Sequence, residues 1–154
     1  MDLIQKSFDS SQNGDSTLEF ARQLGLDKGV SGYVYHSVPI ALHAWFRYPD
    51  DFQQAIVSVV ECGGDTDSVA AMVGGLIGAQ VGETGIPMEW RKGLIESPRS
   101  LSWMKALSLQ LSHSLRTGAP DRPIRLPIAK LLLRNLFFLC IILGHGFRRL
   151  LPPY

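Results

Sequence analysis

One stretch of this sequence constrains the fold more than any other. Positions 65–68 hold two carboxylates and two hydroxyls in a row, Asp-Thr-Asp-Ser, and a small, apolar, glycine-rich segment follows at 69–82. Residues two positions apart point to nearly opposite sides of a regular helix, so Asp65 and Asp67 cannot converge inside one. At a helix start they can converge, because the two preceding glycines allow a sharp turn and the unpaired N–H groups there favour negative charge. The pattern predicts that Asp65 caps a long helix that continues to about Val81.

The same cluster is a set of hard oxygen donors. The side-chain oxygens of Asp65, Asp67 and Ser68 suit Mg²⁺, Mn²⁺ or Ca²⁺ better than Zn²⁺, which prefers nitrogen and sulfur ligands. Capping acids ahead of a tightly packed core helix explain the pattern equally well without any metal. The residues alone leave both interpretations open.

The helix predicted behind the acids carries a glycine at every fourth position: Gly74, Gly78 and Gly82. Residues four apart share one helix face, and each helical glycine costs roughly 0.5–1 kcal/mol relative to alanine. We therefore expect another element, or a partner, to pack very close to this face.

Three other motifs place acids or glycines in a similar order. A calcium-binding EF-hand loop is excluded because Val69 and Ala70 stand where it needs an oxygen ligand and a glycine. A phosphate-binding P-loop is excluded because no lysine occurs between Glu61 and Arg91. The Asp-x-Asp-x nucleophile motif of haloacid-dehalogenase-like phosphatases fits residues 65–69, but that motif follows a buried strand in an α/β fold. It stays a lesser alternative.

Helix-capping residues, together with the helix breakers glycine and proline, predict helices along most of the chain. They bound these helices at 17–24, 37–46, 52–61, 65–81 and 100–117, with a last apolar helix that Pro127 opens. No period-two alternation occurs, so the predicted class is all-α. We expect residues 1–16 to form a polar loop, 17–118 to carry the acidic motif, and 119–154 to form a basic and apolar helix and tail.

Charge is unevenly distributed, although the formal net charge is only +1. Residues 1–96 hold 6 basic and 13 acidic residues, whereas residues 97–154 hold 9 basic residues and 1 acidic residue. The basic part either packs on the acidic remainder or meets a phosphate-bearing ligand or partner. The overall balance gives no support for a nucleic-acid binder.

The apolar C-terminal segment bears on the question of a membrane. Its uninterrupted part, Leu136–Leu143, is eight residues long, far below the ~20 that span a bilayer, so we expect a buried helix and no membrane contact. The N-terminus shows no basic region followed by an apolar run, and Cys62 and Cys140 have no metal or redox spacing. These features predict a cytoplasmic protein with reduced thiols.

Several segments together carry a resemblance to a known family. They are the run 63–71, Gly74, Gly78-Ala79, Gly82, Gly85-Ile86-Pro87 and Trp90, preceded by 31–34, 37–42 and 51–52. In this order they resemble the C-terminal signature of the ADP-ribosylglycohydrolase family, which includes the dinitrogenase reductase-activating glycohydrolases. The similarity covers roughly residues 30–95.

The resemblance implies an all-helical fold around two divalent metal ions, Mg²⁺ or Mn²⁺. It also implies hydrolysis of the N- or O-glycosidic bond that joins ADP-ribose to a protein side chain or another acceptor. It matches Asp65, Asp67 and Ser68 to metal ligands, and Gly32, Tyr33 and Thr66 to positions near the substrate.

The sequence also departs from the family pattern. Members carry an N-terminal half with an acidic catalytic residue and a Thr-Asp-Asp metal segment, and this chain contains no Thr-Asp-Asp. A Mg²⁺ ion takes about six ligands, more than two aspartates and a serine supply. We therefore expect the chain to correspond to the C-terminal half only, to lack the catalytic residues, and to be inactive alone. The alternative is a non-catalytic binding or assembly module of the same fold, whose glycine face docks a complementary N-terminal half.

Overall fold

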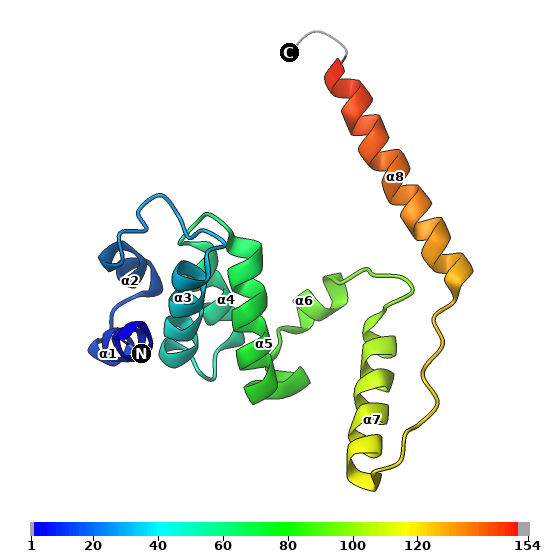
Figure 1. Ribbon diagram of the computed structural model, residues 1–154, viewed down its shortest axis with the longest axis horizontal. Coiled ribbons are helices and arrows are strands. Elements are labelled where there is room, and N and C mark those ends of the chain that lie inside the picture. The colour runs from blue at the N-terminus through cyan, green and yellow to red at the C-terminus, as the bar shows by residue number, and fades with distance from the viewer. Residues whose placement is uncertain (1, 151–154) are drawn as a thin grey trace. The chain divides into compact units, whose positions relative to one another are not determined.

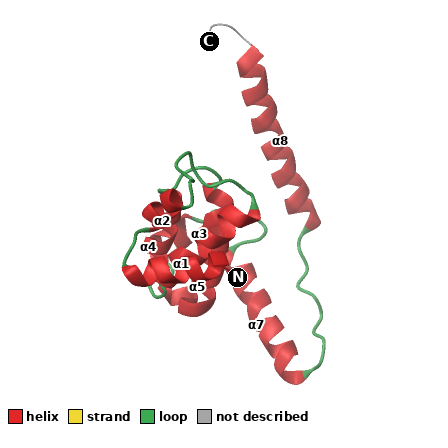
Figure 2. Cartoon of the chain, turned by 60° about the vertical axis from the view of Figure 1, so that its left-hand side comes forward, coloured by secondary structure: helices red, strands yellow, loops and turns green. Residues whose placement is uncertain are grey.

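The computed structural model describes residues 2–150, and all regular elements in that range are helices (Figure 2). In chain order they are α1 (Asp2–Asn13), α2 (Thr17–Gln23), α3 (Val34–Arg47), α4 (Phe52–Val60), α5 (Thr66–Gly85), α6 (Met88–Gly93), α7 (Leu101–Thr117) and α8 (Ile128–Leu150). The described residues contain no strand, only an isolated parallel bridge between Val30 and Gly64. The all-α prediction is confirmed, and the phosphatase alternative is wrong because no strand precedes Asp65 in the described range.

The chain divides into two compact units, the first ending at Trp90 and the second starting at Arg91. This boundary differs from the expected divisions after residues 16 and 118. In the first unit α1 packs on α3, and α5 packs on both α3 and α4 (Figure 1). The core of this unit includes Phe20 and Ile40 together with Val69, Val73 and Ile77, which follow one face of α5.

The N-terminal segment is a helix, so the prediction of a loop at residues 1–16 is wrong. The buried residues of α1 are serines: Ser7, Ser10 and Ser11. The Ser7 hydroxyl lies 2.8 Å from the Leu3 carbonyl and 3.1 Å from the Pro39 carbonyl of α3, and it is fully buried. The large apolar residues of α1 are only Leu3, Ile4 and Phe8, and serines fill its buried positions. The polar composition of residues 1–16 therefore suggested a loop.

Helix α3 begins at Val34, three residues ahead of the predicted start at residue 37, so Pro39 lies inside the helix. Proline has no N–H, so the carbonyl four residues earlier, on Tyr35, loses its helical partner. Tyr35 is exposed, so water can satisfy that carbonyl, and the helix tolerates the proline.

Helices α2, α4 and α7 begin and end within one residue of their predicted bounds. The Ser16 side chain accepts a hydrogen bond from the Glu19 N–H while Glu19 reaches back to Ser16, which is a complete capping box. The Asp51 carboxylate accepts from the Gln54 N–H at the start of α4. Ser100 caps α7, and Gly118 ends it in the left-handed conformation with φ of 67°.

In the second unit, α7 and the loop after it are joined by side-chain contacts. His113 Nδ1 lies 3.0 Å from an Asp121 carboxylate oxygen, and the Gln110 amide donates to the Arg122 carbonyl. In α8, Arg134 forms an ion pair of 2.7 Å with Glu96. No residue of α8 is buried, so the expectation of a buried C-terminal helix is wrong.

Candidate functional site

Two glycine-containing segments lie backbone against backbone at the start of α5. The Val30 N–H donates to the Gly63 carbonyl at 3.0 Å, and the Asp65 N–H donates to the Val30 carbonyl at 2.6 Å. Gly64 has φ of +82°, and a Cβ there would lie 2.2 Å from the Val30 carbonyl oxygen. Only glycine allows both the backbone angle and the close approach. The contact fixes where the acidic turn sits relative to the loop that leads into α3.

Gly32 lies directly against the first acid of the motif. A Cβ at position 32 would stand 2.6 Å from Oδ2 of Asp65. The absence of a side chain at Gly32 therefore creates the space that this carboxylate occupies. The sequence placed Gly32 near the site only through the family resemblance, and the structure brings it into contact with Asp65.

Asp65 occupies the N-cap position of α5, but its side chain forms no capping hydrogen bond. The predicted N-cap position of Asp65 is therefore confirmed, but the capping hydrogen bond expected from its side chain is absent. A carboxylate without a capping bond can turn toward neighbouring groups, here toward Gly32 and Asp67.

The two carboxyl groups of the motif converge. A hydrogen bond with the Asp65 side chain lowers the pKa of Asp67, and the backbone N–H groups of Ser68 and Asp67 lower it further. Asp67 and Ser68 are exposed, whereas Asp65 and Thr66 are half-buried. A cation beside two neighbouring carboxylates lowers the repulsion between them. Convergence at the helix start, predicted from spacing, is present in the structure.

This donor set fits part of the coordination sphere of a hard divalent cation. Asp65, Asp67 and Ser68 present carboxylate and hydroxyl oxygens at one helix start, the ligand type that Mg²⁺ and Mn²⁺ take. Among residues 2–150 no group of three or more His, Cys, Asp or Glu side chains gathers around a common point. The chain therefore offers a partial ligand set, and water or other protein groups would have to complete it.

A cluster of ring side chains borders the site at the start of α3. The Tyr33 ring packs against Tyr35 and, edge to face, against His36, with centroid distances of 5.4 Å in both cases. The Ser31 hydroxyl and His36 Nδ1 are 2.9 Å apart. Tyr33 is 58% exposed and Tyr35 61%, so both rings can meet a ligand. Ser31, Tyr35 and His36 were not among the candidate residues, since their only sequence signal was nearness to Gly32.

The glycine face of α5 is already covered within the first unit. A Cβ at Gly74 would lie 3.6 Å from Cδ1 of Ile56, and one at Gly78 would lie 3.6 Å from Cε2 of Phe52. These are ordinary contacts with α4, so the expectation of a very close approach is wrong. Gly82 leaves the helix with φ of 67° and ψ of −171° and forms no part of this face. The proposed docking of a partner on the three glycines is therefore also wrong.

The open side of α5 lies elsewhere. A groove of about 470 Å³ runs between α3 and α5, and its lining is almost entirely apolar. Met72 and Leu76 of α5 lie in it and are 40% and 36% exposed. Helix α5 thus packs on α4 and α3 and keeps one apolar surface uncovered.

Comparisons with known proteins identify relatives of this chain. The family model described as ADP-ribosylglycohydrolase matches residues 2–120. An ADP-ribosylarginine hydrolase, Tri1, of Serratia proteamaculans is 38% identical over 69 residues, which are 45% of this chain and 19% of that protein. The ADP-ribosylhydrolase ARH3 of Gallus gallus is 33% identical over 66 residues, 36% of this chain and 18% of that protein. An uncharacterized protein of Archaeoglobus fulgidus is 39% identical over 57 residues, 37% of this chain and 18% of that protein.

The extent of these matches limits what they say. The chain spans less than a fifth of the length of these curated relatives, and no solved structure matches it. The expectation of a C-terminal half is not borne out, because the family match begins at residue 2 and is not confined to the 30–95 region that suggested it. The match nevertheless covers most of the chain, including the glycine loop and the acidic helix start. The chain belongs to the ADP-ribosylglycohydrolase family.

Proposed function

We propose that this chain carries part of the metal centre of an ADP-ribosyl hydrolase, which removes ADP-ribose from modified side chains by hydrolysing an N- or O-glycosidic bond. The contact of Gly32 with the Asp65 carboxylate is the observation that carries the proposal. It supports a site in which a backbone without a side chain and two converging acids leave room for a ligand. The family membership and the names of the relatives support the reaction class.

In this proposal Asp65, Asp67 and Ser68 hold Mg²⁺ or Mn²⁺. A divalent ion there supplies Lewis acidity, which stabilises the charge that builds up on oxygen during hydrolysis. Gly32 keeps the space beside the carboxylates open. The exposed ring of Tyr33 offers a flat apolar face to the sugar or the base of ADP-ribose. Thr66 lies next to both acids and is assigned to the substrate side.

The same proposal makes the isolated chain inactive. At most three side chains supply metal ligands, fewer than the six or so that Mg²⁺ takes. The remaining ligands and the catalytic acid or base would come from a complementary portion of the family fold. The location is taken as cytoplasmic, and the expected substrates are ADP-ribosylated proteins or small molecules that contain ADP-ribose.

The groove between α3 and α5 supports a second candidate, a non-catalytic assembly module. Its apolar lining, with Met72 and Leu76 exposed, is the kind of surface that a complementary protein portion covers. Under this alternative the chain folds and docks but binds no metal of its own.

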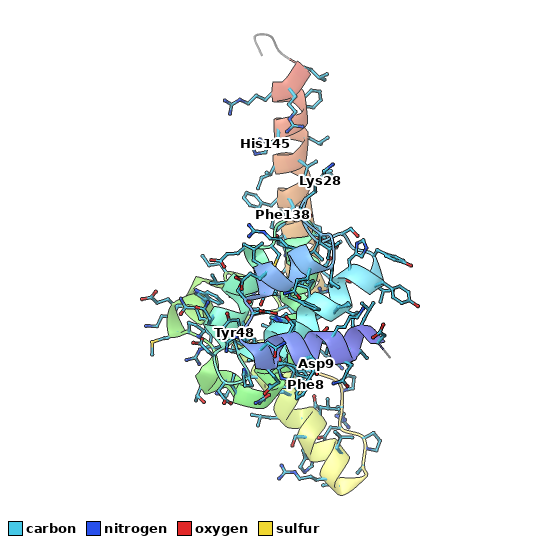
Figure 3. The ribbon with its side chains drawn as sticks, turned by 90° about the vertical axis from the view of Figure 1, so that its left-hand side faces the viewer. Phe8, Asp9, Lys28, Tyr48, Phe138 and His145 are labelled. Carbon is cyan, nitrogen blue, oxygen red and sulfur yellow. The ribbon has the colours of Figure 1, made fainter. Side chains whose placement is uncertain are left out.

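Metal titration separates the two candidates. The full chain is titrated with Mn²⁺, and the bound ion is followed by the loss of the free-ion electron paramagnetic resonance signal. The first candidate predicts weak saturable binding that Asp67→Asn abolishes and that Asp9→Asn, a matched substitution of an exposed acid on α1 (Figure 3), leaves unchanged. Absence of binding, or equal loss with both substitutions, would count against the metal centre.

Turnover is measured in parallel on peptides that carry ADP-ribosylated arginine or serine. We expect none from the chain alone with Mg²⁺ or Mn²⁺. Turnover that Asp67→Asn removes would show that the site is complete within this chain and would overturn the expected inactivity.

A further inference from the structure

Helix α8 presents an apolar surface that no other element of the second unit buries. The apolar residues Leu132, Leu136, Leu139, Leu143 and Phe147 are between 49% and 64% exposed. The family match ends at residue 120, ahead of α8, which begins at Ile128. The packing of the family fold therefore gives no account of this helix, and its surface needs an occupant of its own.

The charges of α8 are confined to one side. At about 100° per residue, Lys130, Arg134, His145, Arg148 and Arg149 all fall within roughly a third of the helix circumference. The five apolar residues named above are centred on the opposite side. Phe138 and His145, both labelled in Figure 3, lie on the basic side by the same count. Helix α8 is therefore amphipathic, with a wide apolar face.

The basic side has no acid of its own to neutralise it. From Arg122 to the end of the sequence there are six Lys or Arg residues and no Asp or Glu. Within α8, Arg134 is held by Glu96 at 2.7 Å and lies 4.8 Å from the ring centroid of Phe138. Among the described residues of the second unit, Lys130, Arg148 and Arg149 have no carboxylate within ion-pair distance.

A transmembrane span fits this pattern poorly, although α8 has 23 residues and a mean hydropathy of 1.7 over its most apolar window. The stretch from Leu136 to Phe147 rises only about 18 Å, against the ~30 Å of a bilayer core. Lys130 and Arg134 precede this stretch on the same side of the helix, which would put Arg134 inside the hydrocarbon of a spanning segment.

A second copy of the chain is another possible occupant, but it suits only the apolar side of α8. Pairing two α8 helices would cover the apolar faces but leave both basic sides without anionic partners. A lipid surface with negatively charged headgroups meets both sides of one helix at once. The apolar face enters the acyl region, and the cations reach the headgroups.

We propose that α8 is an in-plane membrane anchor that binds anionic lipid. Because the cytoplasmic leaflet carries the negative lipids of a cell, the anchor is compatible with a cytoplasmic chain. The proposal replaces the expectation of no membrane contact, and it does not depend on whether the family site binds metal.

Flotation with lipid vesicles tests the anchor. The full chain is mixed with phosphatidylcholine vesicles, with or without phosphatidylserine as roughly one lipid in three. We expect the chain to float with the anionic vesicles, to stay behind with the neutral ones, and to detach as salt is raised. Equal flotation with both lipids, or with neither, overturns the proposal.

Matched substitutions identify the contacts. Replacing Lys130, Arg148 and Arg149 by alanine should lower the partition coefficient on anionic vesicles roughly a hundredfold, since each cation near the surface contributes about fivefold. Replacing Arg99, Arg116 and Arg122 removes the same charge outside α8 and should lower it less than about fivefold. Equal losses in the two triple variants contradict a specific role for α8.

A substitution on the apolar face tests its insertion. Leu139→Asp should abolish flotation while the far-ultraviolet circular dichroism of the chain in solution stays the same. Unaltered flotation of that variant contradicts insertion of the apolar face.

Depth of insertion distinguishes an in-plane helix from a span. Cys140 is exposed on α8, whereas Cys62 is buried and its pKa is raised to about 11 by that burial, so a thiol dye at neutral pH labels Cys140 selectively. Bromines attached near the headgroups should quench the dye more strongly than bromines near the bilayer centre. Stronger quenching from the centre would show a span and overturn the proposal.

The oligomeric state gives a further outcome. A chain that does not bind vesicles, but forms a dimer that Leu139→Asp dissociates, would identify a second copy of the chain as the occupant and overturn the proposal.

Discussion

Gly32 contacts the Asp65 carboxylate, which occupies the space that a side chain at position 32 would fill. A Cβ there would stand 2.6 Å from Oδ2. The carboxylate is the end of a flexible side chain, so it can move away from an added methyl group while the backbone stays in place. Affinity for metal and stability of the fold should therefore respond differently to a substitution at Gly32.

Gly32→Ala should lower the affinity for Mn²⁺ about tenfold while lowering the free energy of unfolding by less than about 1 kcal/mol. The methyl group displaces Asp65 from Asp67 without straining the backbone. Mn²⁺ titration and urea unfolding of the same sample measure the two effects. Gly75→Ala is the control, because a Cβ at Gly75 meets nothing within 4 Å. An unchanged Mn²⁺ affinity in Gly32→Ala would show that the carboxylate position does not matter for binding.

Gly64→Ala should lower the free energy of unfolding by at least about 2 kcal/mol. It combines a left-handed backbone angle, φ of +82°, with a Cβ 2.2 Å from the Val30 carbonyl oxygen. Gly25→Ala separates the two causes, since Gly25 has φ of +75° and open space around it, and should cost about 1 kcal/mol. Equal losses for the two variants in urea unfolding would mean that the contact with Val30 contributes nothing.

Stability should fall in acid because of His43. Its ring is fully buried and stacks on Phe20 with a centroid distance of 4.6 Å, and burial lowers its pKa from 6.5 to about 4. Below pH 6.5 the unfolded state binds a proton at His43 and the folded state does not. The stability that the neutral His43 ring contributes is therefore fully present above pH 6.5 and is lost as the pH falls toward 4. The loss over that window amounts to up to about 3 kcal/mol.

Urea unfolding between pH 7 and pH 4.5 measures this dependence. His43→Phe keeps a ring against Phe20 and removes the titrating group, so the slope of stability against pH should become shallower. The Thr17 hydroxyl, 3.4 Å from His43 Nδ1, keeps the Ser58 hydroxyl as a partner at 3.1 Å. A slope identical in both proteins would assign the acid sensitivity to other groups.

Gly74→Ala and Gly78→Ala should each be neutral or raise the free energy of unfolding by up to about 1 kcal/mol. Each new methyl group meets α4 at 3.6 Å, which is ordinary contact. Alanine also has the higher helix propensity. Thermal unfolding of the single variants and of Gly78→Leu, which overfills the space beside Phe52, gives the comparison. Destabilisation by alanine itself would show that the glycine face is packed more tightly than these distances indicate.

Local chemistry in the sequence determined most helix boundaries and the position of the acids. Ser16, Asp51 and Ser100 cap helices because a side-chain oxygen satisfies nearby N–H groups whatever surrounds it. The two acids of the 65–68 motif fall at a helix start for the same kind of reason, since glycines and unpaired N–H groups lie next to them in the chain. Such effects act over a few residues, and a sequence displays them directly.

Long-range packing decided the rest. Helix α1 is held on α3 through the Ser7 hydroxyl, and a serine does not stand out in a sequence as a buried residue. The partner of Asp65 is Gly32, a neighbour that only the close approach of two distant backbone segments creates. Whether an apolar helix is buried also depends on which other elements are there to cover it, and no residue of α8 is buried within the second unit. The sequence by itself determined most of the helices and the chemistry of the acidic turn. Only the tertiary structure decided which surfaces meet, because burial depends on contacts between residues far apart in the chain.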